Sequence, residues 1–275
     1  MPSVEVAEQA GDHFSGPDRS EDVVLVLPNA VAVLDGATSL SPAARSGGWY
    51  AAQLAEALRP RLAVPGADLA DVLAEAISDV ADTWELRPGA SPSSTASLLR
   101  WDDDHVEALV LADSPIVVFT GDGPQPVIDD QLAALGSGGG YRERLLSGGG
   151  FGAGHRRALG SSMDRTSRWR NVDGGFWVAE AVPEAAFHAA RADWPRPAVR
   201  AALAATDGVS CGVQEYGSYE DWSAMLEEAS RAGPRAVLDR VRAAEEADPD
   251  GTRWPRPKRH DDQALALVRF ASPIV

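Results

Sequence analysis

The chain has 275 residues, of which 44% are hydrophobic, and this is enough apolar material for one sizeable core. Its 41 acidic and 25 basic residues give a net charge of −16, which argues against a nucleic-acid partner because phosphate backbones are bound by basic surfaces. The composition shows no break that would mark a second domain, so we expect one domain over residues 1–275.

A β-hairpin is predicted near the N-terminus. Two apolar runs, 23–27 and 30–34, are separated by a Pro-Asn pair, which is typical of two antiparallel strands and their turn. Glu21 and Asp22 open the first run, and Asp35 closes the second. Antiparallel pairing therefore predicts that these three carboxylates lie close together at one edge of a sheet.

The remaining elements follow from the periodicity of apolar residues. Helical spacing predicts core-facing helices over residues 43–58, which Pro60 ends, and over residues 69–84. Two further helices are expected over residues 219–232 and 235–247. Strands are expected at residues 4–6, 91–101, 106–111, 116–120, 175–180, 199–206 and 264–268.

The segment at about 131–172 differs from the rest of the chain in composition. It contains two Gly-Gly-Gly runs, and from Arg142 to Arg170 it has seven arginines against two acids. A mobile surface segment is the simplest interpretation of such a sequence. The functional alternative is a flexible flap whose positive charge draws in an anionic substrate, and the sequence leaves both interpretations open.

Acidic residues gather where apolar runs end. Asp35-Gly36 follows the run 30–34, and Asp207-Gly208 follows the predicted strand 199–206. Several carboxylates at packed strand ends repel one another unless they take up protons, spread apart or hold cations. Oxygen ligands favour Mg²⁺ or Mn²⁺, and a single cysteine with five histidines at no metal-ligand spacing argues against zinc. The acids that adjoin apolar runs are Glu21, Asp22, Asp35, Asp113, Asp207, Asp261 and Asp262.

Six short motifs include all seven of these acids. In chain order they are Ser20-Glu21-Asp22, Val33-Leu34-Asp35-Gly36, Ser94-Thr95-Ala96, Leu111-Ala112-Asp113-Ser114, Thr206-Asp207-Gly208-Val209 and Asp261-Asp262-Gln263-Ala264. Each motif is short, but the ordered set covers about residues 4–270. As a set they resemble the motifs of the metal-dependent serine/threonine phosphatases of the protein phosphatase 2C type.

The resemblance implies a fold and a reaction. The fold is α+β, with two antiparallel β-sheets packed as a sandwich and helices on both outer faces. The reaction is the one-step hydrolysis of phosphoserine or phosphothreonine in proteins by a water shared between two Mg²⁺ or Mn²⁺ ions. The implied partner is a phosphorylated protein in a kinase-linked pathway. Bacterial members of the family hold a third ion.

The resemblance also implies roles for individual residues. Asp35 would bridge both ions and the Gly36 carbonyl would bind one of them. Asp207 and Asp261 would complete the ligands of the other ion, and Asp35 and Asp207 would act in catalysis through the metal-bound water. The supporting residues would be Glu21 and Asp22, directly or through water, Asp113 for a third ion, and Asp262, which would orient its neighbours.

Departures from the family pattern concern substrate binding more than metal binding. Pro17 stands where the family places a phosphate-binding arginine, and Arg19 is the candidate substitute. Residues 37–39 replace the usual His or Met and Gly-Gly after the first Asp-Gly, so no general acid is identified. Pro115 stands where the family often has arginine, and Ala264 replaces the closing threonine.

Two other functions therefore stay open. A catalytically weak or inactive phosphatase fold could serve as a binding module that recognises phosphorylated partners or sequesters a kinase. Alternatively, the substrate is a small phosphorylated metabolite, over which the flap could close as easily as over a peptide.

The single cysteine, Cys211, is expected to be a small buried residue, because the segment after it lacks the arginine of a phosphate-cradling cysteine loop. One cysteine excludes an internal disulfide, which fits a reducing cytosol. The first ten residues lack the basic start of a signal peptide, and no apolar run approaches the ~18 residues of a membrane helix. We therefore expect a cytoplasmic protein without a membrane partner.

Overall fold

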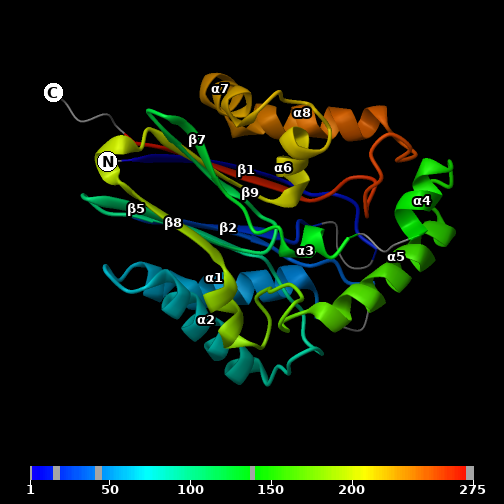
Figure 1. Cartoon of the computed structure of the whole chain (residues 1–275), viewed down its shortest axis with the longest axis horizontal. Coiled ribbons are helices and arrows are strands. Elements are labelled where there is room, and N and C mark those ends of the chain that lie inside the picture. Colours follow the sequence, from blue (N-terminus) through cyan, green and yellow to red (C-terminus); the bar gives the residue numbers. More distant parts are fainter. Residues whose placement is uncertain (1, 15–18, 41–44, 137–139, 271–275) are drawn as a thin grey trace.

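Two β-sheets packed face to face form the centre of the molecule (Figure 1). The computed structural model describes residues 2–14, 19–40, 45–136 and 140–270. Each sheet has five antiparallel strands, and helices cover both outer faces. The α+β sandwich that the family resemblance implies is therefore confirmed.

The strand order joins the two ends of the chain in one sheet. The first sheet has the order β1 (Ser3–Gln9), β10 (Gln263–Arg269), β9 (Ala201–Ala205), β6 (Ile116–Thr120) and β7 (Gly123–Val127). The second sheet has the order β2 (Asp22–Leu27), β3 (Ala30–Asp35), β4 (Ala96–Trp101), β5 (His105–Leu111) and β8 (Ala190–Pro195). Because β1 pairs with β10, the N-terminal segment lies beside the closing acidic motif.

Helices on the outside explain why the central strands are apolar throughout. In β3, Val31 and Val33 face the other sheet, while Ala32 and Leu34 pack toward the helices. Both faces of the strand are thus buried, and its sequence is a continuous apolar run. The helices on the second sheet are α1 (Gly47–Leu62) and α2 (Leu69–Trp84), and those on the first are α6 (Asp207–Gln214), α7 (Trp222–Ala232) and α8 (Pro234–Ala247).

Both strands that the sequence did not predict lie at a sheet edge. β7 pairs only with β6 and contains Pro124 and Pro126. Proline has no amide hydrogen to donate, so edge positions tolerate it and the local sequence does not resemble a strand. β8 alternates between half-buried and exposed residues and pairs only with β5.

The predicted end of the first helix is wrong. α1 continues through Pro60 to Leu62. Leu58 and Leu62 are both fully buried, and their burial outweighs the one helical hydrogen bond that the proline removes. Residues 43 and 44, where the prediction starts this helix, lie outside the described residues.

The predicted strand at 175–180 is also wrong. Phe176 and Ala179 each form only a single bridge, and Ala179 exchanges both backbone hydrogen bonds with Ser94, ahead of β4. From Ser97 on, β4 is paired with β3 on one side and β5 on the other, so its backbone has no room for another strand.

The Gly-rich segment 131–172 contains helices, which the sequence did not predict. Tyr141, Leu145 and Leu159 form a small apolar cluster of their own within it. Its helices are α3 (Gln131–Ala134), α4 (Gly140–Leu146), α5 (Ala153–Thr166) and the 3₁₀ helix η1 (Ser167–Trp169); two further 3₁₀ helices are η2 (Pro183–His188) and η3 (Arg196–Ala198). Across the described residues, every helix is too short or too polar to cross a membrane.

Candidate metal centre

The hairpin of β2 and β3 brings the first two acids together. Asp22 and Asp35 are directly paired in the antiparallel register. Thr95 fixes Asp35 by two hydrogen bonds: the Asp35 amide donates to Thr95 Oγ1 at 3.0 Å, and the Thr95 amide donates to the Asp35 carbonyl at 2.9 Å. Asp22 is only 5% exposed, so the pair lies at a covered edge of the sheet.

A third acid comes from the opposite sheet. β9 ends at Ala205, Thr206 follows it, and Asp207 is the first residue of α6. The Thr206 hydroxyl donates to Asp22 Oδ2 at 2.9 Å, and the carboxyl groups of Asp207 and Asp35 share a hydrogen bond. Acids from both sheets therefore meet at one end of the sandwich.

The closing motif lies beside this group. The Lys258 ammonium is 2.7 Å from Asp261 Oδ1 and 3.4 Å from Asp262 Oδ2. Burial disfavours the charge on Lys258, but the two carboxylates outweigh burial and raise its pKa above the usual value. Gly208 permits the close approach, because a Cβ on it would lie 1.9 Å from the Asp262 carbonyl oxygen.

Burial and mutual repulsion change the ionisation of these acids. Burial raises the pKa of Asp35 well above its ordinary range, and the charges of Asp22 and Asp207 raise it further. Burial likewise raises the pKa of Asp22. The pKa of Asp207 rises from 3.8 to about 8, through burial first and then through Asp261 and Asp113. Such shifts indicate a group of acids with too little positive charge around it.

Asp113 and Glu21 lie within the electrostatic field of this group. Burial raises the pKa of Asp113, and the charges of Asp129 and Asp261 raise it further. Burial also raises the pKa of Glu21, while the nearby Lys258 lowers it. The structure thus brings the acids of five of the six motifs into one region.

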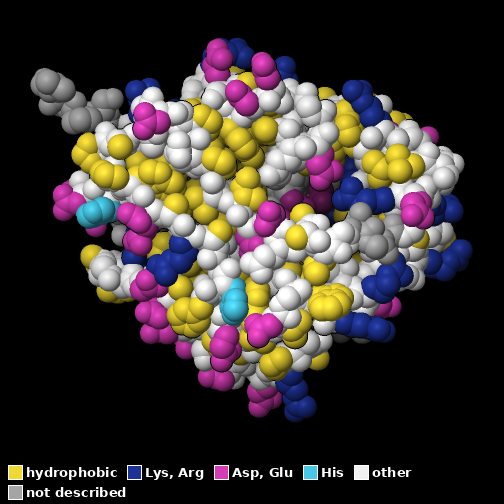
Figure 2. Space-filling view, viewed as in Figure 1, with side chains coloured by type: hydrophobic (Ala, Val, Ile, Leu, Met, Phe, Trp, Pro, Cys, Tyr) yellow, Lys and Arg dark blue, Asp and Glu magenta, His cyan; other side chains and the backbone are white. Residues whose placement is uncertain are grey.

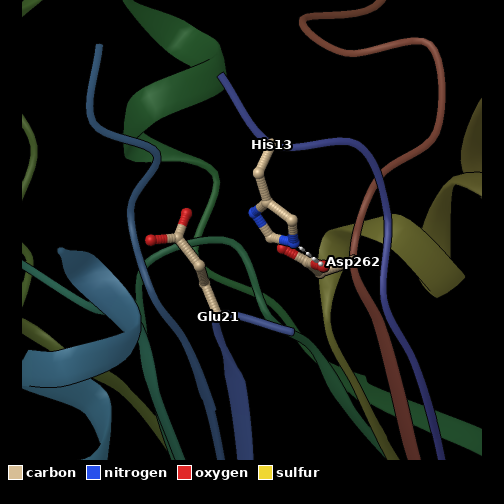
Figure 3. A group of neighbouring side chains, drawn as sticks. All are labelled: His13, Glu21 and Asp262. Atoms are coloured by element: carbon tan, nitrogen blue, oxygen red, sulfur yellow. Dashed lines mark ion pairs between the residues drawn. The ribbon is translucent and has the colours of Figure 1, made fainter. Parts of the chain in front are cut away.

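A histidine that the sequence did not single out also lies here. His13, Glu21 and Asp262 each offer a ligand atom, and these atoms lie within 4.8 Å of one another (Figure 3). His13 Nε2 is 3.4 Å from Asp262 Oδ1, and its side chain is 5% exposed. Spacing along the chain does not reveal this contact, because it depends on the pairing of β1 with β10.

The predicted phosphate-binding residue forms no described contact with the acids. Arg19 is exposed, and within the described parts of the chain no ion pair or hydrogen bond joins it to the acidic group. Pro17 lies outside the described residues. The role of Arg19 stays a prediction.

Gly36 allows α1 to pack on the end of β3. The Gly36 amide donates to the Glu21 carbonyl at 3.2 Å. A Cβ on Gly36 would lie 2.3 Å from the Gly48 amide nitrogen and 2.4 Å from the Gly47 carbonyl carbon. Glycine is therefore required at this position by the N-terminus of α1.

Several solved structures of phosphatases share this architecture. The catalytic domain of the serine/threonine protein phosphatase PstP, in complex with two manganese ions, aligns with a TM-score of 0.56 at 14% identity, covering 98% of this chain and 97% of that one. The chain has the fold of the metal-dependent serine/threonine phosphatases. PppA from Pseudomonas aeruginosa aligns with a TM-score of 0.56 at 20% identity, covering 98% of this chain and 97% of that one. A bacterial serine phosphatase aligns with a TM-score of 0.59 at 11% identity over 100% of both chains.

No family model and no curated protein sequence matches the chain. At identities of 11% to 20%, the similarity of this phosphatase fold to its neighbours establishes the architecture. What the centre can do must therefore be argued from its own residues.

The donors of this phosphatase-fold centre fit divalent cations. They are carboxylate oxygens, which Mg²⁺ and Mn²⁺ prefer. Asp22 Oδ1 is buried and, within the described residues, has no hydrogen-bond partner. Because this buried carboxylate oxygen lies beside Asp35 and Asp207 and is not hydrogen-bonded, it is suited to hold a cation either directly or through water.

A pocket of about 590 Å³ opens next to the centre. Its lining includes Ala37 and Thr38, which directly follow Asp35-Gly36. Figure 2 shows acidic side chains inside a hollow on one face of the molecule, and basic side chains gathered over α4 and α5. The basic residues that line the pocket are Arg45, Arg87 and Arg170.

Without divalent ions, the protein is expected to lose stability as the pH rises from about 5 to about 8. Folded Asp207 keeps its proton up to its pKa of about 8, whereas the unfolded residue loses it near 3.8. The folded state then holds the extra proton, so the free energy of unfolding falls by about 1.4 kcal/mol per pH unit for that group. Urea unfolding in chelator at several pH values measures the slope.

The variant Asp207→Asn supplies the control for this pH dependence. It removes the titrating group, so its slope should be shallower than that of the wild type by about 1.4 kcal/mol per pH unit. Equal slopes for the two proteins would contradict a raised pKa at Asp207.

Proposed function

We propose that the chain is a Mg²⁺- or Mn²⁺-dependent phosphomonoester hydrolase that acts on phosphoserine and phosphothreonine in proteins. The observation that carries this proposal is the meeting of buried Asp22 with the half-buried Asp35 and Asp207, from two sheets, in one mutually repelling group. When bound, two divalent ions would supply an activated water and neutralise the phosphoryl oxygens.

The roles proposed for the residues follow their positions. Asp35 lies at the centre of the group and would contact both ions, with the adjacent Gly36 carbonyl on one of them. Asp207 and Asp261 would hold the other ion. Supporting roles are proposed for Glu21, Asp22 and Asp113, and Asp262 would orient His13 and Lys258.

Hydrogen bonds within the chain would keep this centre rigid. Thr95 holds the backbone of Asp35 from β4, and the Thr206 hydroxyl holds the carboxylate of Asp22. Ligands held in this way need not reorganise when an ion binds, which favours affinity.

The pocket beside the centre supports a protein substrate. Its lining holds three arginines against Glu85 and Asp164, and Arg170 is already paired with Glu180 at 3.2 Å. Arg45 and Arg87 would therefore attract a chain segment that carries phosphate or neighbouring acids. The arginines at 142–170 would extend this attraction, with 131–172 acting as a flexible flap, and Arg19 would contact the phosphate. The kinase-linked pathway and the cytoplasmic location are part of the same proposal and rest on the phosphoprotein substrate and the single cysteine.

A second candidate function is a binding module with weak or no catalysis. Lys258 favours it, because its ammonium already contacts Asp261, one of the proposed metal ligands. Such a module would bind phosphopeptides without releasing phosphate. A small phosphorylated metabolite is a third candidate, and the pocket volume is the observation that favours it.

Phosphate release by the purified chain tests the three candidates together. With Mn²⁺, we expect hydrolysis of an aryl phosphate and faster hydrolysis of a phosphothreonine peptide than of sugar or nucleoside phosphates, with no release in chelator. Peptide binding by calorimetry without release would favour the binding module. Preference for the small phosphates would favour the metabolite.

A further inference from the structure

Lys258 is the only lysine of this chain, and the other basic residues are all arginines. Its side chain is 5% exposed, whereas lysines almost always keep their ammonium group in water. A buried ammonium is stable only when it is paired. Its partners here are carboxylates of the candidate metal centre.

The surrounding loop holds Lys258 in place. Arg256, two residues before it, is buried and donates to Asp248 Oδ2 at 2.9 Å, to the Glu245 carbonyl at 3.1 Å and to the Arg259 carbonyl at 2.8 Å. The Pro257 carbonyl is 2.7 Å from a ring nitrogen of His155. Residues on both sides of Lys258 are thus anchored, so the direction of its side chain is set by the fold.

The ammonium occupies a position that a divalent ion would also need. It lies 2.7 Å from Asp261 Oδ1 and 3.4 Å from Asp262 Oδ2. A divalent cation bound to Asp261 Oδ1 would lie close to the Lys258 ammonium. The two positive charges would repel each other strongly at such distances. Asp22 and Asp35, on the hairpin side of the group, have no ion pair with a basic residue among the described contacts.

We propose that Lys258 is a resident cation of the acidic group, and that a divalent ion binds on the Asp261 side only by displacing its ammonium. This inference rests on the proposed function in so far as the centre binds divalent ions. The two ions then bind unequally: the ion on the Gly36 side binds first, and the ion on the Asp261 side binds more weakly. Phosphate release would therefore increase with the fraction of the protein in which the weaker ion is bound.

Calorimetric titration with Mn²⁺ tests the displacement. We compare the wild type with Lys258→Met, which keeps an unbranched side chain one heavy atom shorter and removes the charge, and with Arg259→Met. Arg259 is the exposed neighbour, so its replacement makes the same change in net charge outside the acidic group. We expect the weaker Mn²⁺ association constant to rise about tenfold or more in Lys258→Met and to change little in Arg259→Met.

The single lysine also allows a test without any substitution. In protein labelled with ¹³C- and ¹⁵N-lysine, the side chain of Lys258 gives one set of signals. Addition of Mg²⁺ should shift its Cε signal along the same binding curve as the weaker ion, because the ammonium leaves Asp261.

The outcomes separate this inference from the proposed function. Unchanged lysine signals at saturating Mg²⁺, or equal Mn²⁺ affinities in the wild type and Lys258→Met, would overturn the resident cation while leaving the metal centre intact. No Mn²⁺ binding by the wild type and by Lys258→Met would overturn the metal centre, and the inference with it.

Discussion

Replacing Asp35 by asparagine is expected to abolish phosphate release in the presence of Mn²⁺, with a loss of about 10³-fold or more in kcat/KM. Asp35 is the acid that the other members of the group surround: it pairs with Asp22 and shares a hydrogen bond with Asp207. The substitution keeps the shape of the side chain and removes the charge that would hold both ions. Steady-state kinetics on an aryl phosphate measures the loss.

The same variant should not weaken the metal-free fold. Burial and neighbouring acids raise the pKa of Asp35, so its ionised form opposes folding, and an uncharged asparagine removes this penalty. At neutral and alkaline pH, where the unfolded carboxyl is ionised, the free energy of unfolding of Asp35→Asn in chelator should therefore equal or exceed that of the wild type. Asp103→Asn, at an exposed position between β4 and β5, is the matched control and should leave both activity and stability unchanged. Activity that survives in Asp35→Asn would refute the role assigned to Asp35.

Replacing Gly36 by alanine is expected to destabilise the protein by about 3 kcal/mol. The new Cβ would lie 2.3 Å from the Gly48 amide nitrogen, and the neighbouring atoms are backbone at the first turn of α1, which cannot rotate away as a side chain would. α1 must shift from the end of β3 or β3 must bend. Urea unfolding measures the change in the free energy of unfolding.

Gly152→Ala provides the comparison for this substitution. A Cβ on Gly152 meets no atom within 4 Å, and the residue has no left-handed backbone conformation; it is the N-cap of α5, where alanine is less favourable than glycine, so its replacement should cost about 1 kcal/mol or less. Equal stabilities of Gly36→Ala and Gly152→Ala would show that α1 does not pack against Gly36 as described. Mn²⁺ affinity should fall in Gly36→Ala alone, because Glu21 contacts the same turn.

Elements with both faces buried could be predicted from the sequence, because burial imposes a pattern on every residue. The hairpin of β2 and β3 is the clearest case: Glu21, Asp22 and Asp35 were predicted to lie close together at one edge, and Asp22 and Asp35 are directly paired in the observed register. The edge strands β7 and β8 could not be predicted in this way. Half of each such strand is in contact with solvent, so proline and polar residues are tolerated and the pattern is lost.

The residues of the candidate metal centre also differ in how far the sequence could predict them. Acids at the ends of apolar strands carry a local signal, and they were predicted together. His13 and Lys258 carry none, because each contacts Asp262 through the packing of a loop that has no strand or helix pattern. Lys258 had one signal that could have drawn attention to it, its status as the only lysine.

The number of Mn²⁺ ions bound by the purified chain tests the central claim most directly. Calorimetry on the chelator-treated and dialysed wild type should give two ions per chain, one bound more tightly than the other, and Asp35→Asn should bind neither. A wild-type chain that takes up no Mn²⁺, or an Asp35→Asn variant that binds as well as the wild type, would contradict the account.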